Sequence, residues 1–451
     1  MRREIVPVRF AGDGSGEAPL TWAQADHWQA IAAAGQAATF GGSFAMPPSF
    51  TRDSASVLLS TLLGRHQALR TRLRFTADGS PRQVCSADGV IELLVAADAD
   101  DPAAVAEQLV AEFRTTPFDF EQDWPVRMAV VPDDGFVHLV IVYLHLALDG
   151  GAAAVLMAEF DFTAPDLGVP TAPVTAVQPL AQAESQSQPS ALRASAAALR
   201  YFGRVFRSVP LRLFEPRYPG PAEYRALRFR SPATRPALER IATEHEVSLP
   251  TAMLAVFAIG VARYRGDGQV WAMQLVSNRF RPGLAEAVSI LVQASPCALD
   301  VGASTLAEAL GQARSALLLS YKHAYYESGR CEQIRQQIGR ERGAEVEISC
   351  YYNDRLGLLP PASASAGGAD LGALLGQGEL LADYGGPALP EFPLFFNVDS
   401  GGGVVEFPMT YDARYFTPDD LSRLARLVEE AAVELALTPD RPVLEQALLH
   451  R

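Results

Sequence analysis

The sequence predicts an α/β protein made of two lobes. The chain has 451 residues, which is more than one ordinary hydrophobic core accommodates. Long helical patterns and short apolar strand patterns alternate in both halves. Residues 162–192, rich in Pro, Ala, Thr, Gln and Ser, have little apolar periodicity and are typical of a surface connection. We therefore expect a first lobe at 1–175, a connection with a linker helix at 176–205, and a second lobe at 206–451.

Capping residues and turn residues place the elements of the first half. A helix is expected at 21–35, with Thr21 as its cap and Gly35 as its stop, and another at 101–114, capped by Asp101. The remaining expected elements are an edge strand at 4–10, a helix at 51–68, a strand ending at residue 75, and a hairpin of strands 126–131 and 136–146 turning at 132–135.

The second half repeats this alternation. Expected helices lie near 191–206, at 234–266 with a break near Pro250, at 304–326 and at 417–437, the last capped by Thr417. Expected strands lie at 224–232, 269–279, 345–356 and in a hairpin over 391–416 turning at 400–403, with an extended segment at 289–301.

Composition excludes several classes of protein. Apolar content of 49% and charged content of 20% are ordinary for a globular protein, and the net charge of −14 argues against a general binder of nucleic acid or anionic membrane. No signal sequence and no apolar run of 18 residues is present. The four widely spaced cysteines contain no CxxC pair, so we expect no metal site and a reducing, cytoplasmic setting.

The most informative stretch is FVHLVIVYLHLALDGG at 136–151. Its apolar run predicts a buried strand, and the residues after Gly151 favour a helix. His145 therefore lies where a strand opens into a loop, and imidazole is the usual general base near neutral pH. Gly150 and Gly151 allow close backbone approach, and amides of the next helix start could favour developing negative charge. A His and an Asp four residues apart near a turn are also common without any function.

Other catalytic signatures are missing from the sequence. It contains no G-x-S-x-G elbow, no P-loop and no HExxH. These absences argue against a serine hydrolase of that type, a P-loop nucleotidase and a zinc hydrolase.

The segment LHLALDG at 144–150 resembles the HHxxxDG signature of nonribosomal peptide synthetase condensation domains and the HxxxDG of the wider chloramphenicol acetyltransferase-like superfamily. Further segments resemble that family in the same order along the chain. They are PLTWAQADHW at 19–28, RHQALRTRLRF at 65–75, PFDFEQDWPVRMAVV at 117–131, SNRFRP at 277–282, YKHAYYE at 321–327 and FPMTYDARYFTPDDLSRL at 407–424.

The resemblance implies a fold and a set of site residues. The fold would be two chloramphenicol acetyltransferase-like lobes in a V-shaped pseudo-dimer with a tunnel between them. His145 would be the catalytic histidine, and Asp149 would support the site by pairing with Arg65, together with Gly150. Tunnel-lining candidates are Leu144, Gly151, Asn278 and Arg279.

The resemblance also implies a reaction. It indicates a condensation-type acyltransferase that joins an acyl or aminoacyl thioester to an amine or hydroxyl acceptor, small or peptidyl, in natural-product biosynthesis. No cofactor would be tightly bound, and the donor would be carried on phosphopantetheine. The sequence leaves open a carrier protein, coenzyme A or an aminoacyl-tRNA as the source of the donor. We expect a monomer, free-standing because no adenylation or carrier segment is recognisable, and no membrane association.

Two departures from the family pattern keep an alternative open. Leu144 replaces the first histidine of the signature, and Asn278 stands where a glycine usually precedes the arginine. Such changes would also fit a catalytically silent module that recruits or scaffolds biosynthetic partners.

Overall fold

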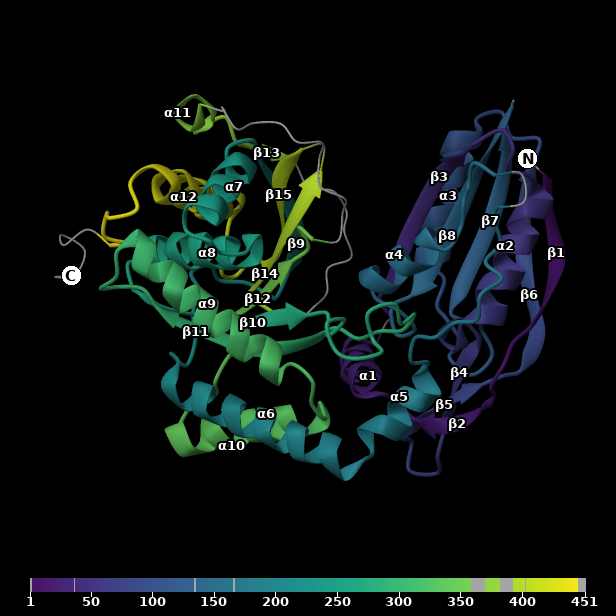
Figure 1. The fold of residues 1–451 in the computed structure, drawn as a ribbon, viewed down its shortest axis with the longest axis horizontal. Coiled ribbons are helices and arrows are strands. Elements are labelled where there is room, and N and C mark those ends of the chain that lie inside the picture. Colours follow the sequence, from purple (N-terminus) through teal and green to yellow (C-terminus); the bar gives the residue numbers. More distant parts are fainter. Residues whose placement is uncertain are drawn as a thin grey trace. The chain divides into compact units, whose positions relative to one another are not determined.

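The chain folds into two compact units of mixed helix and sheet (Figure 1). The structure is a computed structural model, and it describes residues 2–35, 37–133, 135–164, 167–357, 370–381, 392–401 and 403–444. Unit 1 comprises residues 1–193 and 277–292, and unit 2 comprises 194–276 and 293–451. The predicted α/β class is confirmed. The V-shape and the tunnel concern the placement of the two units and stay predictions.

The units differ from the predicted lobes in two places. Residues 277–292, expected within the second lobe, belong to unit 1, although they connect two strands of unit 2. Residues 176–193, expected as a connection, also belong to unit 1 and contain helix α5 (Pro179–Gln186). This helix is anchored through glutamine, since the Gln186 side chain accepts a hydrogen bond from the Trp22 amide at 2.9 Å. Because its residues are mostly polar, the helix has no apolar periodicity by which the sequence could predict it.

A five-stranded sheet forms the centre of unit 1. Its order is β1 (Arg2–Ala11), β6 (Asp88–Ala97), β7 (Val126–Asp133), β8 (Phe136–Leu144) and β3 (Thr39–Met46). Neighbouring strands are antiparallel except β6 and β7. The predicted edge strand is confirmed, because β1 with Pro7 lies at the edge. The predicted hairpin is β7–β8, and only Asp134 of its turn lies outside the described residues.

Both faces of this sheet are covered by helices (Figure 1). Helix α2 (Arg52–Arg65) packs through Leu58 and Leu62 in one core cluster, which contains Ile141 of β8. Helix α3 (Pro102–Thr115) packs through Leu109 in a second cluster, which contains Val140 of the same strand. Burial on both faces explains why β8 is an unbroken apolar run rather than an alternating one.

Several further elements complete unit 1. They are α1 (Trp22–Ala34), the 3₁₀ turn η1 (Gln67–Arg70), α4 (Gly150–Ala158) and a three-stranded sheet of β2 (Gly16–Pro19), β5 (Pro81–Cys85) and β4 (Thr71–Phe75). The predicted caps Thr21 and Asp101 both accept hydrogen bonds from helix amides, and Gly35 ends α1 in the left-handed conformation.

Unit 2 is organised around a seven-stranded sheet. Its order is β11 (Gln293–Asp300), β10 (Gln269–Val276), β12 (Cys350–Asp354), β14 (Leu394–Gly401), β15 (Val404–Asp412), β9 (Tyr224–Ser231) and β13 (Glu379–Leu381). Its helices are α6 (Pro189–Ser208), which begins in unit 1, α7 (Thr234–Glu244), α8 (Leu249–Arg265), α9 (Leu306–His323), α10 (Gly329–Arg342), α11 (Leu371–Leu374) and α12 (Pro418–Leu437). The Thr417 cap of α12 is confirmed. Part of the predicted 391–416 hairpin, residues 391 and 402, lies outside the described residues.

Two further expectations concern membrane spans and cysteines. Within the described ranges no single helix is both long and apolar enough to cross a membrane, whereas α7 and α8, bent by 116° at their break, meet that criterion only as a pair. The structure describes all four cysteines, and none of them is in a disulfide.

Candidate active site

His145 lies directly after the last residue of strand β8. Its backbone amide donates to the Ala38 carbonyl at 2.9 Å, and the Ala147 amide donates to the Leu144 carbonyl at 3.0 Å, closing a turn. Helix α4 begins at Gly150. The predicted sequence of buried strand, short loop and helix is therefore confirmed, with the imidazole at the exit of the strand.

Two aromatic rings contact the His145 imidazole. The ring centroid of Phe40, on β3, lies 5.1 Å away at an interplanar angle of 60°. The ring centroid of His27, on α1, also lies 5.1 Å away, at 37°. His145 itself is partly buried. Its ring is thus in contact with rings from two different elements.

Asp149 is a buried brace for the loop that carries His145. It is 2% exposed, and both of its carboxylate oxygens accept hydrogen bonds. Oδ1 accepts from the Ala152 amide at 2.8 Å and from Arg279 Nη2 at 2.6 Å, and Oδ2 accepts from the Leu291 amide at 2.9 Å. The bond to Ala152 makes Asp149 the N-cap of α4. These contacts fix the position of α4 relative to residues 277–292, within unit 1.

The predicted ion pair between Arg65 and Asp149 is wrong, because Asp149 pairs with Arg279. The Arg279 guanidinium, whose side chain is 13% exposed, also donates to the carbonyls of Ala287 at 2.7 Å and Ser289 at 3.3 Å. The sequence gives no distances between separate segments, so it could not show which arginine lies beside Asp149. Arg279 thus completes the brace, and its predicted place in a tunnel stays a prediction.

Arg65 acts at the opposite end of α4. It donates to Glu159, the residue that ends this helix, at 2.9 Å and to the Ala172 carbonyl at 2.8 Å. His66 Nε2 donates to the same Glu159 oxygen at 3.1 Å. Burial would raise the pKa of Glu159, but the hydrogen bonds from His66 and Arg65 outweigh it and lower that pKa. Both ends of α4 are thus held, although the predicted support of the site by Arg65 stays a prediction.

The two glycines after Asp149 are not equivalent. A Cβ added to Gly150 would meet no atom within 4 Å. A Cβ added to Gly151 would lie 2.4 Å from Arg279 Nε, which no real side chain tolerates. Gly151 therefore leaves the space through which Arg279 reaches Asp149. The predicted supporting role of Gly150 and tunnel position of Gly151 stay predictions.

The structure explains why Asn278 can stand where the family pattern has a glycine. Its backbone φ of 57° lies in the left-handed region, which favours glycine and which asparagine adopts more readily than most residues. Its side chain is buried and donates through Nδ2 to the Leu291 carbonyl at 3.0 Å. The asparagine thus keeps the backbone conformation that a glycine would supply. Its predicted place in a tunnel stays a prediction.

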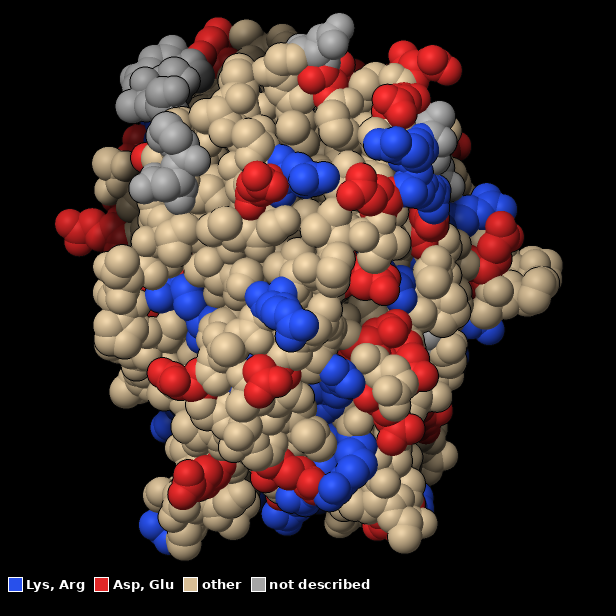
Figure 2. Space-filling view, turned by 90° about the vertical axis from the view of Figure 1, so that its right-hand side faces the viewer, with Lys and Arg blue, Asp and Glu red and all other residues tan. Residues whose placement is uncertain are grey.

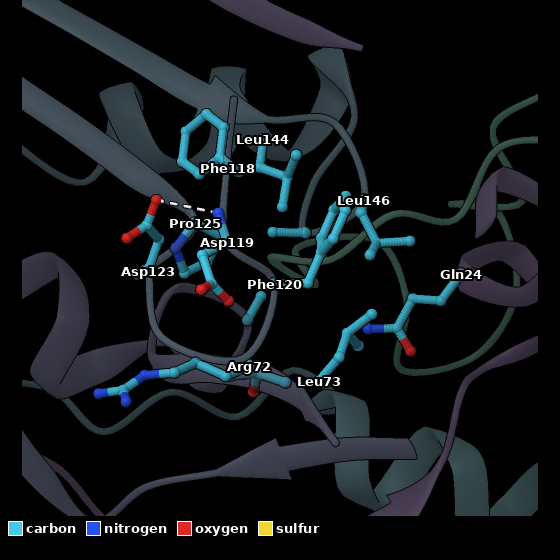
Figure 3. Close-up of a pocket in the computed structure, with 13 residues that line it drawn as sticks. Gln24, Arg72, Leu73, Phe118, Asp119, Phe120, Asp123, Pro125, Leu144 and Leu146 are labelled. Atoms are coloured by element: carbon cyan, nitrogen blue, oxygen red, sulfur yellow. Dashed lines mark hydrogen bonds between the residues drawn. The ribbon is translucent and has the colours of Figure 1, made fainter. Parts of the chain in front are cut away.

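The structure also explains the second departure, Leu144 in place of the first histidine of the signature. It is 5% exposed and belongs to an apolar cluster with Ile31, Leu73, Phe118 and Leu146. Figure 3 shows Leu144, Leu146 and Phe118 lining one side of a small pocket, with Asp119 and Asp123 on another. The pocket holds about 20 Å³, room for roughly one water molecule and not for a substrate. At this position the chain uses an apolar side chain for packing.

Other site features follow from the same geometry. Within the described ranges, no three His, Cys, Asp or Glu side chains come together as a metal-binding group. The Ala152 amide, at the start of α4, is engaged by Asp149, so it is not open to the developing negative charge that the sequence assigned to this helix start. Sequence reasoning did not single out His27 or Phe40, since contact between distant segments is not encoded in local spacing. The quoted segment at 19–28 nevertheless contained His27.

This arrangement defines an HxxxDG-type site. The histidine directly follows a strand that is buried on both faces, and the aspartate holds the start of the next helix. The family model described as Condensation domain matches residues 15–349. The chain therefore belongs to the condensation-domain family. Members of this family are in general acyltransferases that form amide bonds, and they act on substrates carried on the phosphopantetheine of carrier domains.

Three similar proteins illustrate the relationship. The N-(5-amino-5-carboxypentanoyl)-L-cysteinyl-D-valine synthase of Amycolatopsis lactamdurans is 27% identical over 249 residues, which are 53% of this chain and 7% of that protein. The first condensation domain of the calcium-dependent antibiotic synthetase, solved with a substrate analogue, has a TM-score of 0.69 at 18% identity, covering 96% of this chain and 99% of that one.

The condensation domain described for chain release from the enacyloxin polyketide synthase has a TM-score of 0.69 at 19% identity, covering 95% of this chain and 84% of that one. These likenesses confirm the chloramphenicol acetyltransferase-like fold that the resemblance implied.

Gly151→Ala is expected to destabilise the protein, whereas Gly150→Ala is not. The added methyl group displaces Arg279 from Asp149, and such overpacking costs about 1–3 kcal/mol. At Gly150 the methyl group meets nothing, and alanine stabilises a helix by about 0.5–1 kcal/mol. Urea unfolding of both variants measures the difference. Equal midpoints would contradict the role given to Gly151.

Asp149→Ala is expected to damage stability at least as much as activity. Removing it takes away the α4 cap and leaves the Arg279 charge uncompensated, and breaking a buried pair costs about 3–5 kcal/mol. The double variant with Arg279→Ala should lose less than the sum of the single losses. A thermal melting curve measures both effects. An intact melting temperature with lost turnover would instead assign Asp149 a direct role in catalysis.

Leu144→His, which restores the two-histidine signature, is expected to destabilise the protein. The imidazole would enter an apolar cluster, and a poorly paired buried polar group costs about 1–3 kcal/mol. Leu144→Met is the matched control, since this exchange usually costs less than about 1.5 kcal/mol. Unfolding midpoints compare the two variants, and a histidine variant as stable as the parent would show that position 144 is open to polar groups.

Proposed function

We propose that this chain catalyses a condensation reaction, in which an amine or hydroxyl acceptor attacks the carbonyl of an acyl or aminoacyl thioester. The observation that carries the proposal is the placement of His145. It lies at the exit of β8, its ring contacts two other rings, and the loop that follows is braced by Asp149. A general base must be held in reach of the proton that it takes, and a fixed loop provides this.

The proposed step balances without an added reagent. His145 removes or positions the proton of the acceptor as its nitrogen or oxygen attacks the thioester carbonyl, and a tetrahedral oxyanion forms. Collapse of this intermediate breaks the carbon–sulfur bond. The proton passes to the departing sulfur, so the products are an amide or ester and a free thiol. The amide of Ala152 is bonded to Asp149, so we expect the oxyanion to be stabilised by other donors.

We propose that the thioester is carried on phosphopantetheine. Family membership supports a carrier domain as its source, while coenzyme A and aminoacyl-tRNA remain as outcomes of the test below. The charge of the protein argues weakly against an aminoacyl-tRNA as the donor. The net charge is −14, and Figure 2 shows Lys and Arg interspersed with Asp and Glu on one face, with no broad basic area there. Ion pairs such as Arg3–Glu112 at 2.7 Å are consistent with this mixed surface.

The alternative of a silent recruitment module loses its main support. It was favoured by Leu144 and by the changed region at 278–295. Leu144 has a packing role, and Asn278 keeps a left-handed backbone conformation, so neither change disturbs the surroundings of His145 or the brace of Asp149. These observations favour an acyltransferase over a scaffold. The predicted free-standing state and the identity of the acceptor stay predictions.

His145→Gln is expected to lower turnover by about 10²–10⁴-fold while the protein stays folded, since general acid–base catalysis contributes a factor of that size. Intact-mass analysis of a panel of acyl-loaded carrier proteins, with acyl-coenzyme A and aminoacyl-tRNA as further arms, measures product formation. His138→Gln, earlier on the same strand, is the matched control and should keep near-normal turnover. Near-normal product from the His145 variant would refute the mechanism, and product from none of the donors with the unchanged protein would favour the scaffold.

A further inference from the structure

Helix α1 brings a second imidazole, His27, against the proposed catalytic residue. The centroids of the His27 and His145 rings are 5.1 Å apart, at an angle of 37°. The two residues are separated by more than a hundred positions in the chain, so the contact comes from the fold. Both rings are partly buried. None of the functions described above uses His27.

The position of α1 is fixed on both sides of His27. At its start, Thr21 and Gln24 form a capping box, with the Thr21 amide donating to Gln24 Oε1 at 2.8 Å. Immediately after His27, the Trp28 ring packs against Phe75 at 5.4 Å and Phe120 at 5.2 Å. A side chain on an anchored helix is held more accurately than one on a loop.

A hydrogen bond also fixes the orientation of the His27 ring. Nδ1 lies 3.3 Å from the carbonyl oxygen of Ala23, one turn earlier on α1. Because a carbonyl oxygen only accepts, Nδ1 must carry the proton in this bond. The neutral ring then carries its lone pair on Nε2. His27 is thus defined in position, in ring orientation and in tautomer.

Burial and the neighbouring charges keep the His27 ring neutral. Burial, followed by the nearby His145, lowers the pKa of His27 to about 3, while the Ala23 carbonyl and Asp149 oppose this shift. Arg279 in turn pairs with Asp149. On α1 itself, burial raises the pKa of the adjacent Asp26 to about 7. Near neutral pH, His27 is therefore uncharged.

We propose that His27 is a positioning residue for His145: its fixed ring, together with Phe40, limits the rotation of the His145 imidazole. Leu144 packs in the apolar cluster, so the second imidazole of this site comes from α1 and not from the signature itself. The benefit to catalysis rests on the proposed function, whereas the restriction of the ring does not.

Kinetics of three α1 variants test the catalytic part. His27→Ala removes the ring and is expected to lower kcat by about 10–100-fold with KM changed less than about threefold, as for a misplaced catalytic group. His27→Phe keeps a planar ring in contact and should recover kcat to within about fivefold of the parent. Gln29→Ala, on the exposed side of the same helix, is the control. A phenylalanine variant as slow as the alanine variant would overturn positioning by ring contact.

A measurement without turnover separates this inference from the proposed function. In protein labelled with ¹³C at histidine Cε1, the His145 signal is assigned by its loss in His145→Gln. Relaxation dispersion should show greater ring motion in His27→Ala than in the parent or in His27→Phe. Unchanged His145 relaxation in a folded His27→Ala variant would overturn the inference. This holds even if no donor is turned over, in which case only the proposed function fails.

Acid stability gives a second readout that a spacer role alone would not produce. The pKa of His27 is lower in the folded state than its ordinary value of 6.5, so the unfolded chain binds the extra proton first. The stability contributed by neutral His27 is therefore complete above about pH 6.5 and is lost as the pH falls towards about 3. His27→Phe should flatten this part of the melting profile, with Asp26→Asn run in parallel to separate the titration of Asp26. An unchanged slope in the phenylalanine variant would contradict a buried neutral His27.

Discussion

The buried ion pair between Asp149 and Arg279 is the constraint on which the rest of the site depends. A carboxylate that is 2% exposed is stable only when its oxygens are satisfied, and here two backbone amides and one guanidinium supply the donors. Those donors lie on helix α4 and on residues 277–292. Because a buried charge cannot lose its partners cheaply, the loop between His145 and α4 has little freedom to move.

That constraint separates the roles of neighbouring residues in one short segment. Leu144 fills an apolar cluster, His145 presents a ring at the end of the strand, Asp149 binds Arg279, and Gly151 leaves the space for the guanidinium. The His145 ring contacts Phe40 and His27, and the loop that follows it is held by Asp149. A side chain on a segment fixed in this way is a good candidate for chemistry.

Local signals in the sequence predicted most of the elements near the site, because caps and apolar runs act over a few residues. The strand before His145, the Thr21 and Asp101 caps and the helix after Gly151 were all confirmed. The ion-pair partner of each charged side chain was not predictable in this way. Arg65 and Arg279 both matched family segments, and only the fold places Arg279 at Asp149 and Arg65 at Glu159. The contact of His27 with His145 is likewise a property of tertiary structure, as is helix α5, whose anchoring side chains are polar.

Departures from a family signature are better judged by conformation and packing than by residue identity. Asn278 shares with glycine the tolerance of a positive φ that this position requires, and its side chain adds a hydrogen bond to the Leu291 carbonyl. Leu144 differs from histidine, yet its surroundings are Leu73, Phe118 and Leu146, which suit an apolar side chain. By contrast, no other residue can replace Gly151 without moving Arg279. The changes at residues 144 and 278 therefore leave the ion pair of Asp149 and Arg279 in place, whereas a side chain at residue 151 would displace Arg279.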